Sequence, residues 1–322
     1  MSSKFLSTTI RYRAFAPLIV FFILIISFYF VTKGRFFDPL SINSILSTAP
    51  EWGILSIGVS LLMISGEFDL SVGSVFTLCT LIYAILWLKM GVDPLLSLVM
   101  ILILGAVLGL INGIVTLYIG IPSIITTLGT MYLWRGIALV ICGGLPISYR
   151  GETRPFKDLL TGEIIGIPVQ IIWFLAIAIV LEIILYWHKF GNQVMATGDN
   201  EIAAKEMGIN TKRIKLVCFT IVGILVAFSA VMESTRIGEG SARLGIGYEF
   251  YAIASSVIGG TSLYGGTGTL IGTFFGVLII QSIGTGLAVM GISGYWINVL
   301  IGLIIIIIMG LNILVAKRGR RF

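Results

Sequence analysis

The stretch PLLSLVMILILGAVLGLINGIVTLY, residues 94–118, contains no charged side chain. It is longer than the roughly 20 apolar residues that a membrane-spanning helix requires. An unpaired backbone polar group costs several kcal/mol in hydrocarbon, so only helices or a closed barrel can span a bilayer. Apolar runs of this length favour helices, and the alternation typical of strands is absent. The stretch therefore predicts a transmembrane helix.

The rest of the chain has the same character. Of its 322 residues, 57% are hydrophobic and 11% are charged, and the mean hydropathy is +1.06. We infer an all-α, polytopic integral membrane protein that forms one domain, residues 1–322. The ten predicted helices are 14–32, 47–65, 72–89, 94–118, 123–142, 168–187, 212–234, 248–258, 269–287 and 295–314.

The distribution of basic residues predicts the orientation of the chain. No small-residue cleavage site follows the first apolar run, so we expect an uncleaved helix after a cytoplasmic tail, residues 1–13. With that tail inside, twelve of the 21 basic residues lie on the cytoplasmic side, concentrated in three segments. Both termini are therefore expected in the cytoplasm, with a cytoplasmic loop at 188–211 and an extracytoplasmic loop at 143–167. The twelve are Lys4, Arg11, Arg13, Lys189, Lys205, Lys212, Arg213, Lys215, Lys317, Arg318, Arg320 and Arg321.

Several function classes find no support in the sequence. The three cysteines and the single His188 show no metal-ligand spacing, and no catalytic constellation is present. Residues 260–267, GTSLYGGT, have the glycine spacing of a phosphate-binding loop, but Gly266 stands where the lysine is required. We expect no enzyme activity, metal or cofactor on this chain. The net charge of +6 is explained by the topology and requires no nucleic-acid partner.

Glycines recur at four-residue spacing in two predicted helices, a pattern that lets helices approach closely. The two helices run in opposite directions in the expected topology, which suggests inverted internal repeats of the kind many transporters use. The alternative is chance, because glycine is common in membrane helices. The glycines are Gly105, Gly109 and Gly113 in the fourth helix and Gly268, Gly272 and Gly276 in the ninth.

The predicted helix 248–258 is about 16 Å long at the helical rise, roughly half of a bilayer core, so it cannot span alone. It precedes GGTSLYGGTGT, residues 259–269. Irregular backbone at membrane depth must be buried in protein or line a wet cavity. A short helix interrupted by glycines is typical of a transport path, and an ordinary loop is the alternative.

The polar segment 188–215 contains a predicted short helix, residues 200–207. Asp199 or Asn200 would cap its start and Gly208 would end it. A capped helix between two spanning helices on the cytoplasmic side has no apolar face of its own to bury. We expect it to dock on another protein, and a solvated loop is the alternative.

Four ordered motifs carry a family resemblance, which extends from about Asn43 to the C-terminus. They resemble the ribose-type permeases of bacterial ATP-binding-cassette importers, the family that includes the branched-chain amino acid permeases. The resemblance implies an inner-membrane permease that works as a dimer, with a second copy or a paralogue, among membrane lipid. It also implies an extracytoplasmic solute-binding protein and a cytoplasmic ATPase, on which Mg-ATP binds. The motifs are GEFDLSVGS (66–74), IPSIITTLGTMYLWRGIAL (121–139), GDNEIAAKEMGI (198–209) and GYEFYAIASSVIGGTSLYGGTGTLIGT (247–273).

The third motif matches the family's cytoplasmic coupling loop through its small residues, while Ile202 stands where the most familiar version has Glu. Glu201 lies one residue earlier than that acidic position. The resemblance thus implies contacts with the ATPase from this segment. The residues expected to make them are Asp199, Asn200, Glu201, Ala203, Ala204, Glu206 and Gly208.

The first and last motifs match the family's Asp-Leu-Ser and Gly-Gly-Thr signatures, but Glu67 departs from the commoner pattern. We predict a solute path lined by polar groups of these motifs, because hydroxyls and a carboxylate can replace the hydrogen bonds that a sugar makes with water. Asp69 or Ser71 can also cap the helix that starts near Val72. The path residues are Asp69, Ser71, Thr261 and Ser262.

The sequence therefore predicts the permease subunit of an ATP-driven importer that moves a small polar solute, a monosaccharide, by alternating access. A nucleoside, a polyol, an autoinducer-type furanose or an amino acid are alternative solutes for the same kind of importer. A second class is a transporter driven by an ion gradient, with Asp69 and Glu249 as its ion-binding groups.

Overall fold

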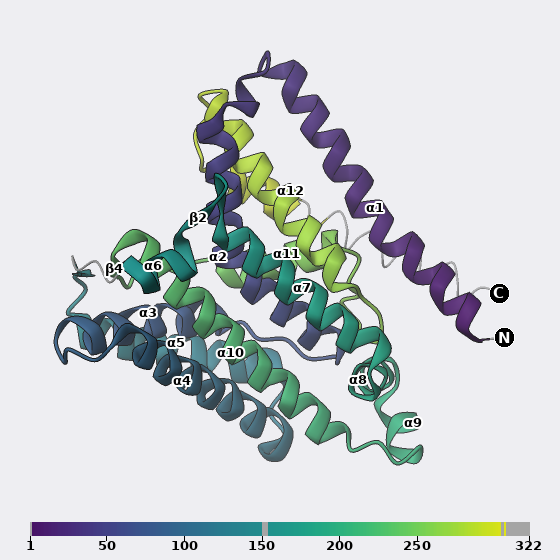
Figure 1. Cartoon of the computed structure of the whole chain (residues 1–322). Coiled ribbons are helices and arrows are strands. Elements are labelled where there is room, and N and C mark those ends of the chain that lie inside the picture. The colour runs from purple at the N-terminus through teal and green to yellow at the C-terminus, as the bar shows by residue number, and fades with distance from the viewer. Residues whose placement is uncertain (1, 150–153, 304–305, 307–322) are drawn as a thin grey trace.

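The computed structural model of the chain describes residues 2–149, 154–303 and 306, which form a bundle of helices (Figure 1). The helices are α1 (Ser2–Val31), α2 (Pro39–Ile64), α3 (Val72–Leu88), α4 (Pro94–Ile114), α5 (Ser123–Cys142), α6 (Arg154–Thr161), α7 (Val169–Trp187), α8 (Lys189–Asp199), α9 (Glu201–Glu206), α10 (Thr211–Ile237), α11 (Tyr248–Ile258) and α12 (Leu270–Val289). A 3-10 helix, η1 (Arg35–Phe37), precedes α2, a π-helix, η2 (Val115–Ile119), extends α4, and residues 296–303 are helical.

Four two-residue strands occur in the described part of the chain. They are β1 (Ile147–Ser148), β2 (Glu163–Ile164), β3 (Ile167–Pro168) and β4 (Glu239–Gly240). β1 pairs antiparallel with β4, and β2 pairs antiparallel with β3. β4 and α6 lie at one end of the bundle, and α8 and α9 lie at the opposite end (Figure 1).

Six helices within the described residues are long and apolar enough to cross a membrane, and α3 and the segment Phe15–Val31 are shorter apolar helices. The prediction of a helical, polytopic membrane protein is thereby confirmed. The number of spans, predicted as ten, stays a prediction. Half of the tenth predicted segment, 295–314, and the basic C-terminal residues lie outside the described residues.

Several helix ends differ from the prediction. α1 begins at Ser2 rather than residue 14, and α2 begins at Pro39, a favoured first helical residue, rather than residue 47. Hydropathy marks only the apolar part of a helix, and polar residues do not end one. Three further features were not predicted: α6, the strands β1 to β3 between residues 147 and 168, and α8 inside 188–211.

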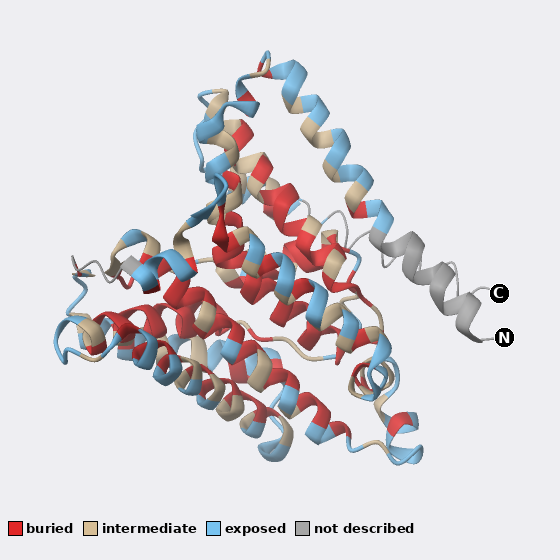
Figure 2. Ribbon diagram, viewed as in Figure 1, coloured by how far each residue is buried: buried red, intermediate tan, exposed pale blue. Residues whose placement is uncertain are grey.

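The core of the bundle is built around α2 and α10, and each of these two helices carries the helices that follow the other one in the chain. α3 and α4 pack on α10, whereas α11 and α12 pack on α2. Buried residues concentrate in these central helices, while residues 15–31 of α1 and the outer sides of α5 and α7 are largely exposed (Figure 2). The exposed large side chains are apolar, as expected for surfaces in contact with lipid.

Glycines permit the closest of these approaches. A Cβ atom on Gly105 or Gly109 of α4 would collide with the backbone carbonyls of Gly223 and Phe219 in α10. A Cβ on Gly113 would lie 2.8 Å from Leu216 Cδ1 of the same helix. The fourth-helix glycines therefore lie in the α4–α10 contact.

The glycines of the ninth predicted helix face different neighbours. A Cβ on Gly272 would collide with the carbonyl of Gly259, at the end of α11, and one on Gly276 with the carbonyl of Ser255. A Cβ on Gly268, in the loop before α12, would lie 2.7 Å from Ile64 Cγ1 of α2.

A carboxylate inside the bundle holds the start of α12. Glu182 of α7 accepts hydrogen bonds from the Thr269 hydroxyl at 2.8 Å and from the Leu270 N–H at 2.6 Å. The first N–H groups of a helix lack intrahelical partners and carry partial positive charge, so a carboxylate stabilises them. The presence of Glu182 in the apolar helix α7 is therefore explained by its contact with the start of α12.

Candidate coupling region and polar cavity

The predicted docking helix is present as α9. The Asn200 side chain caps it by accepting from the backbone N–H groups of Ile202 and Ala203, at 3.1 and 3.0 Å. The helix ends before Gly208, whose φ of +80° favours glycine. Asn200, and not Asp199, is therefore the N-cap, and the predicted glycine stop is confirmed.

α9 is exposed on most of its surface. Ala204 is buried against the bundle with 4% exposure, while Ala203, Glu206 and Gly208 are exposed. Two large apolar side chains, Ile202 at 72% and Met207 at 82% exposure, also lie free on this segment. Such apolar side chains on a polar loop are typical of a protein contact surface.

Lys215, in the second turn of α10, joins α9 to the loop between α2 and α3. Its ammonium donates to Glu67 Oε1 at 2.7 Å and to Glu201 Oε2 at 2.6 Å. Lys205 pairs with the other oxygen of Glu201 at 2.7 Å. Burial alone would raise the pKa of Glu201, but hydrogen bonds from Lys205 and Lys215 outweigh it and lower the pKa to about 2. Glu67, which the sequence analysis left without a partner, is thus part of a charged cluster.

The two signature loops meet the coupling region through backbone contacts. The Gly266 N–H donates to the Ile64 carbonyl at 2.9 Å. A Cβ on Gly198, near the end of α8, would collide with that same carbonyl, and one on Gly265 would lie 3.0 Å from Gly66 Cα. The coupling segment, the end of α2 and the loop 259–269 therefore contact one another at one end of the bundle.

Asp69 and Ser71 belong to one buried hydrogen-bond network. Asp69 Oδ1 accepts from the Ser71 N–H at 2.8 Å and from its hydroxyl at 2.6 Å. The Asn112 amide of α4 donates to Asp69 Oδ2 at 3.2 Å and to the Ser71 hydroxyl at 2.8 Å. Ser71 is the N-cap residue of α3, but its side chain makes no capping bond, because its hydroxyl is engaged by Asp69.

Thr261 belongs to a second network. Its hydroxyl lies 2.7 Å from that of Ser60 in α2, and the Thr273 hydroxyl of α12 donates to Ser60 at 2.9 Å. Ser262 lies in the adjoining turn, where its N–H donates to the Thr267 carbonyl at 2.9 Å. Asp69 and Ser71 thus belong to a network facing α4, whereas Thr261 belongs to one between α2 and α12 and Ser262 lies in the turn beside it.

A polar cavity of about 360 Å³ opens between α2, α10, α11 and α12. On its charged side, Arg236 forms an ion pair with Glu51 through two nitrogens, and Glu233 accepts from the Tyr248 hydroxyl at 2.9 Å. Both Glu51 and Glu233 are buried. These residues come from the middle of α2, the end of α10 and the start of α11, away from the coupling region.

The opposite side of the polar cavity carries aromatic and amide groups. The rings of Trp52 and Tyr251 lie 5.5 Å apart at 45°. The Trp52 indole N–H donates to the side-chain oxygen Oε1 of Gln281 at 3.2 Å, and the side-chain amide nitrogen of Gln281 donates to the Thr48 hydroxyl at 2.7 Å. Gln281 therefore both donates and accepts at the wall of the cavity.

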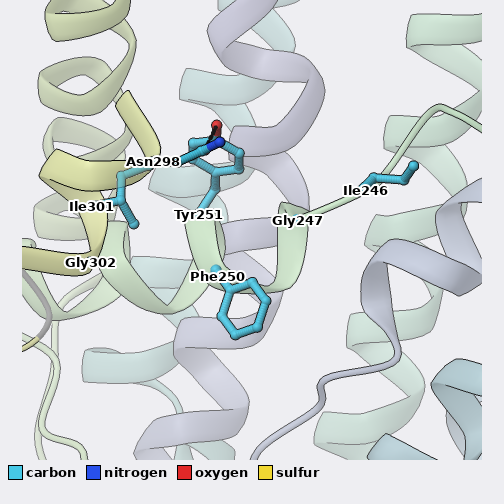
Figure 3. Close-up of a pocket in the computed structure, with 7 residues that line it drawn as sticks. All are labelled: Ile246, Gly247, Phe250, Tyr251, Asn298, Ile301 and Gly302. Atoms are coloured by element: carbon cyan, nitrogen blue, oxygen red, sulfur yellow. Dashed lines mark hydrogen bonds between the residues drawn. The ribbon is translucent and has the colours of Figure 1, made fainter. Parts of the chain in front are cut away.

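A neighbouring cavity of about 420 Å³ shares Tyr251 with the polar cavity. Figure 3 shows Tyr251 and Asn298 pointing toward each other, with Phe250 on the other side of α11. The Tyr251 hydroxyl donates to Asn298 at 3.2 Å. This bond to the helical segment 296–303 fixes the Tyr251 ring between the two cavities.

The sequence analysis missed the polar cavity. Its signals were present, because Glu51 is a carboxylate inside a predicted span, and such residues often mark function. Thr48, Trp52, Ser56 and Ser60 also recur at the four-residue spacing that puts side chains on one face of a helix. Their partners lie about 200 residues away on other helices, where no local pattern points to them.

A helical membrane bundle with a polar cavity and an exposed capped helix is the arrangement expected of a membrane transport protein. Residues 41–309 match the model of the family described as "Branched-chain amino acid transport system / permease component". The chain belongs to this permease family, as the four motifs predicted. No solved structure matches the chain.

Three curated relatives are similar over most of their length. The ribose import permease protein RbsC of Bacillus subtilis is 35% identical, covering 90% of each chain. The xylose/arabinose import permease protein XylH of Sulfolobus acidocaldarius is 33% identical, over 90% of this chain and 82% of the relative. The autoinducer 2 import system permease protein LsrC of Photorhabdus luminescens is 32% identical, over 87% and 83%.

Proposed function

We propose that this chain is the permease subunit of an ATP-binding-cassette importer that carries a monosaccharide across the bacterial inner membrane. Family membership supports the permease role, and relatives named for ribose and for xylose or arabinose support the solute class. The observation that carries the coupling part of the proposal is the exposed, capped helix α9. ATP hydrolysis takes place on a separate cytoplasmic ATPase.

In this proposal, α9 docks in a groove of the ATPase through Ile202 and Met207. Movement of α9 reaches the transmembrane helices through Lys215, which bonds to Glu201 of α9 and to Glu67 before α3. The contacts of Gly198 extend the same connection to the loop 259–269. Closure of the ATPases would thus shift both signature loops together.

We further propose that two inverted halves, α2–α5 and α10 to the C-terminal helix, rock about a central path. The reciprocal packing of α3 and α4 on α10 and of α11 and α12 on α2 supports this arrangement. Both termini and α9 lie in the cytoplasm, a second permease copy or paralogue completes the dimer, and an extracytoplasmic binding protein delivers the solute. Asp69, Ser71, Thr261 and Ser262 stay the predicted lining of the path.

Reconstitution tests this function. The permease is co-purified with its ATPase, placed in proteoliposomes, and supplied with D-ribose or D-xylose on the binding protein. We expect uptake to require ATP on the side of the membrane that the ATPase faces. Uptake by the permease alone, driven by a proton or sodium gradient, would contradict the proposal and favour the ion-coupled class.

Gly208 offers a test of the docking helix. Its φ of +80° is strained for most residues that have a Cβ, and a β-branched residue such as valine especially so. We expect Gly208→Val to leave the permease inserted and folded but to reduce ATP-driven uptake about tenfold or more. The substitution adds about 1–2 kcal/mol of backbone strain, which displaces α9 and weakens its docking on the ATPase. Gly208→Asn is the matched control, since asparagine tolerates this conformation, and it should retain most uptake. Equal uptake by the valine variant and the wild type would exclude this role of α9.

A further inference from the structure

We propose that the polar cavity between α2, α10, α11 and α12 is a binding site for a neutral polyhydroxylated ring, a monosaccharide on its way through the permease. The inference rests on the proposed function and adds to it a place and a set of side chains. The volume of the polar cavity, about 360 Å³, is within the range of small-molecule sites, which run from about 300 to 1,000 Å³.

The aromatic wall suits one face of a sugar ring. The C–H groups on that face carry partial positive charge, and the faces of aromatic rings carry negative charge. Trp52 and Tyr251 present two rings tilted by 45°, which forms a concave rather than a flat surface. Trp52 is only 7% exposed, and Tyr251 is fixed by its bond to Asn298. The wall is therefore in place before solute arrives.

The polar wall suits hydroxyl groups, each of which both donates and accepts a hydrogen bond. Gln281 offers an amide that does the same, and Thr48 adds a hydroxyl. The Gln281–Thr48 bond at 2.7 Å and the Trp52–Gln281 bond at 3.2 Å can be exchanged for bonds to solute hydroxyls without leaving a buried group unpaired.

The charges at this site disfavour an anionic solute and are compatible with a neutral one. Among its lining residues, the guanidinium of Arg236 is already bound by Glu51, and Glu233 adds a second carboxyl group. An anionic solute would meet two carboxyl groups and a cation whose charge is engaged. Sugar hydroxyls can still accept from Arg236 and donate to the carboxylates.

A polar stripe on α2 leads from the cavity toward the other end of the bundle. Thr48 and Trp52 face Gln281, and four residues further along Ser56 lies opposite Ser256, whose hydroxyl is 3.5 Å from the Ser56 carbonyl. After another four residues, Ser60 contacts Thr261 and Thr273. These side chains below the cavity are fully buried or nearly so. The stripe therefore connects the cavity to the Thr261 network through a region that is closed in this state.

The test uses the reconstituted complex with its binding protein and ATPase, and D-ribose and D-xylose as probes. Trp52→Ala removes the aromatic wall, and Gln281→Leu removes the amide at similar volume. Each variant loses contacts to the solute, so we expect uptake at subsaturating sugar to fall about tenfold or more. ATP hydrolysis stimulated by the loaded binding protein should stay within about twofold of wild type, because coupling is intact. Trp52→Phe, which keeps a ring, should retain most uptake.

A direct readout separates binding from a structural effect. Thr48→Cys, in a background with Cys142→Ala, places a thiol at the cavity, and millimolar D-ribose should slow its reaction with a small thiol reagent. Trp187→Ala is the matched control for loss of a tryptophan, since Trp187 lies at the far end of α7 with 81% exposure, and it should transport normally.

The outcomes distinguish the site from the function. If the wild-type complex takes up D-ribose or D-xylose but Trp52→Ala and Gln281→Leu do so equally well, or thiol labelling is unaffected by sugar, the site is wrong and the function stands. If uptake and stimulated hydrolysis fall together in both variants, the residues are structural and the site is also wrong. If the wild-type complex takes up neither sugar with ATP, the proposed function itself fails.

Discussion

Lys215 is held between two carboxylates, 2.7 Å from Glu67 and 2.6 Å from Glu201, with its side chain only 7% exposed. A charge in such surroundings depends on its partners, because water is not available to replace them. Removing the lysine would leave two carboxylates facing each other. Removing Glu67 would leave Lys215 still paired with Glu201.

Lys215→Met should therefore destabilise the permease by about 3–5 kcal/mol, and Glu67→Gln by about 1 kcal/mol. The double variant should recover part of the loss caused by Lys215→Met alone. Thermal unfolding of the detergent-solubilised permease measures both effects. Arg213→Met is the control, since Arg213 is exposed in the same helix, and an equal melting temperature for the two methionine variants would show that the cluster contributes nothing.

The same cluster predicts a pH dependence. The pKa of Glu201 is lowered from 4.5 to about 2, so its ionised form stabilises the fold at pH values above about 4.5, and this contribution is lost as the pH falls toward 2. Its side chain is 36% exposed, so solvent limits the effect to about 1 kcal/mol.

The difference in melting temperature between wild type and Glu201→Gln should accordingly be largest at pH 6 and shrink as the pH is lowered to 3. Glu206→Gln, on the exposed side of the same helix, is the matched control and should show a smaller change. A difference that is independent of pH would mean that the carboxylate charge of Glu201 does not stabilise the fold.

Sequence alone could supply the individual residues but not these pairs. Asp69 and Ser71 were identified from a motif, and their mutual hydrogen bonds are local enough to be expected. The partner of Glu67 lies 148 residues further along the chain, and that of Glu51 lies 185 residues away. Side chains so distant meet only through the packing of α2 against α10, which no local pattern specifies.

At the scale of elements, the α4–α10 contact depends on glycine. Gly105→Ala would direct a methyl group into the Gly223 carbonyl and the Ala227 side chain, so the helices would have to separate. We expect a loss of about 1–3 kcal/mol of stability. Gly129→Ala in α5 is the matched control, because a Cβ there has nothing within 4 Å and alanine is the better helix former. Thermal unfolding of the two variants checks the contrast, and equal stability would show that α4 and α10 can adjust at no cost.

Most elements found from sequence have long apolar runs, and α9 was found from its capping residues. α8 was missed because it is polar and contains Gly191 and Gly198, which argue against a helix. The structure explains both glycines, since a Cβ on Gly191 would collide with the Leu185 carbonyl and one on Gly198 with that of Ile64. Tertiary contact, rather than intrinsic preference, determines this helix.

For the whole molecule, the arrangement of the two ends is what gives the transport proposal a direction. The polar cavity lies between the first half of α2 and the end of α10, and α9 follows α8 and precedes the start of α10. Solute entering at the cavity and force applied at α9 thus act on different parts of the same two central helices. This division suits an importer only if α9 is in the cytoplasm.

That orientation can be tested with two exposed positions at opposite ends of the bundle. Ile165, in the turn between β2 and β3, is 97% exposed, and Met207, after α9, is 82% exposed. Cysteine is introduced at each in a background with Cys142→Ala, since Cys79 and Cys218 are buried. In cells whose outer surface alone is accessible, a membrane-impermeant maleimide should label Ile165→Cys and not Met207→Cys. After permeabilisation Met207→Cys should react, which controls for its reactivity. The opposite pattern would place α9 outside the cell, beyond the reach of any cytoplasmic ATPase, and an ATP-driven importer could not be built on this chain.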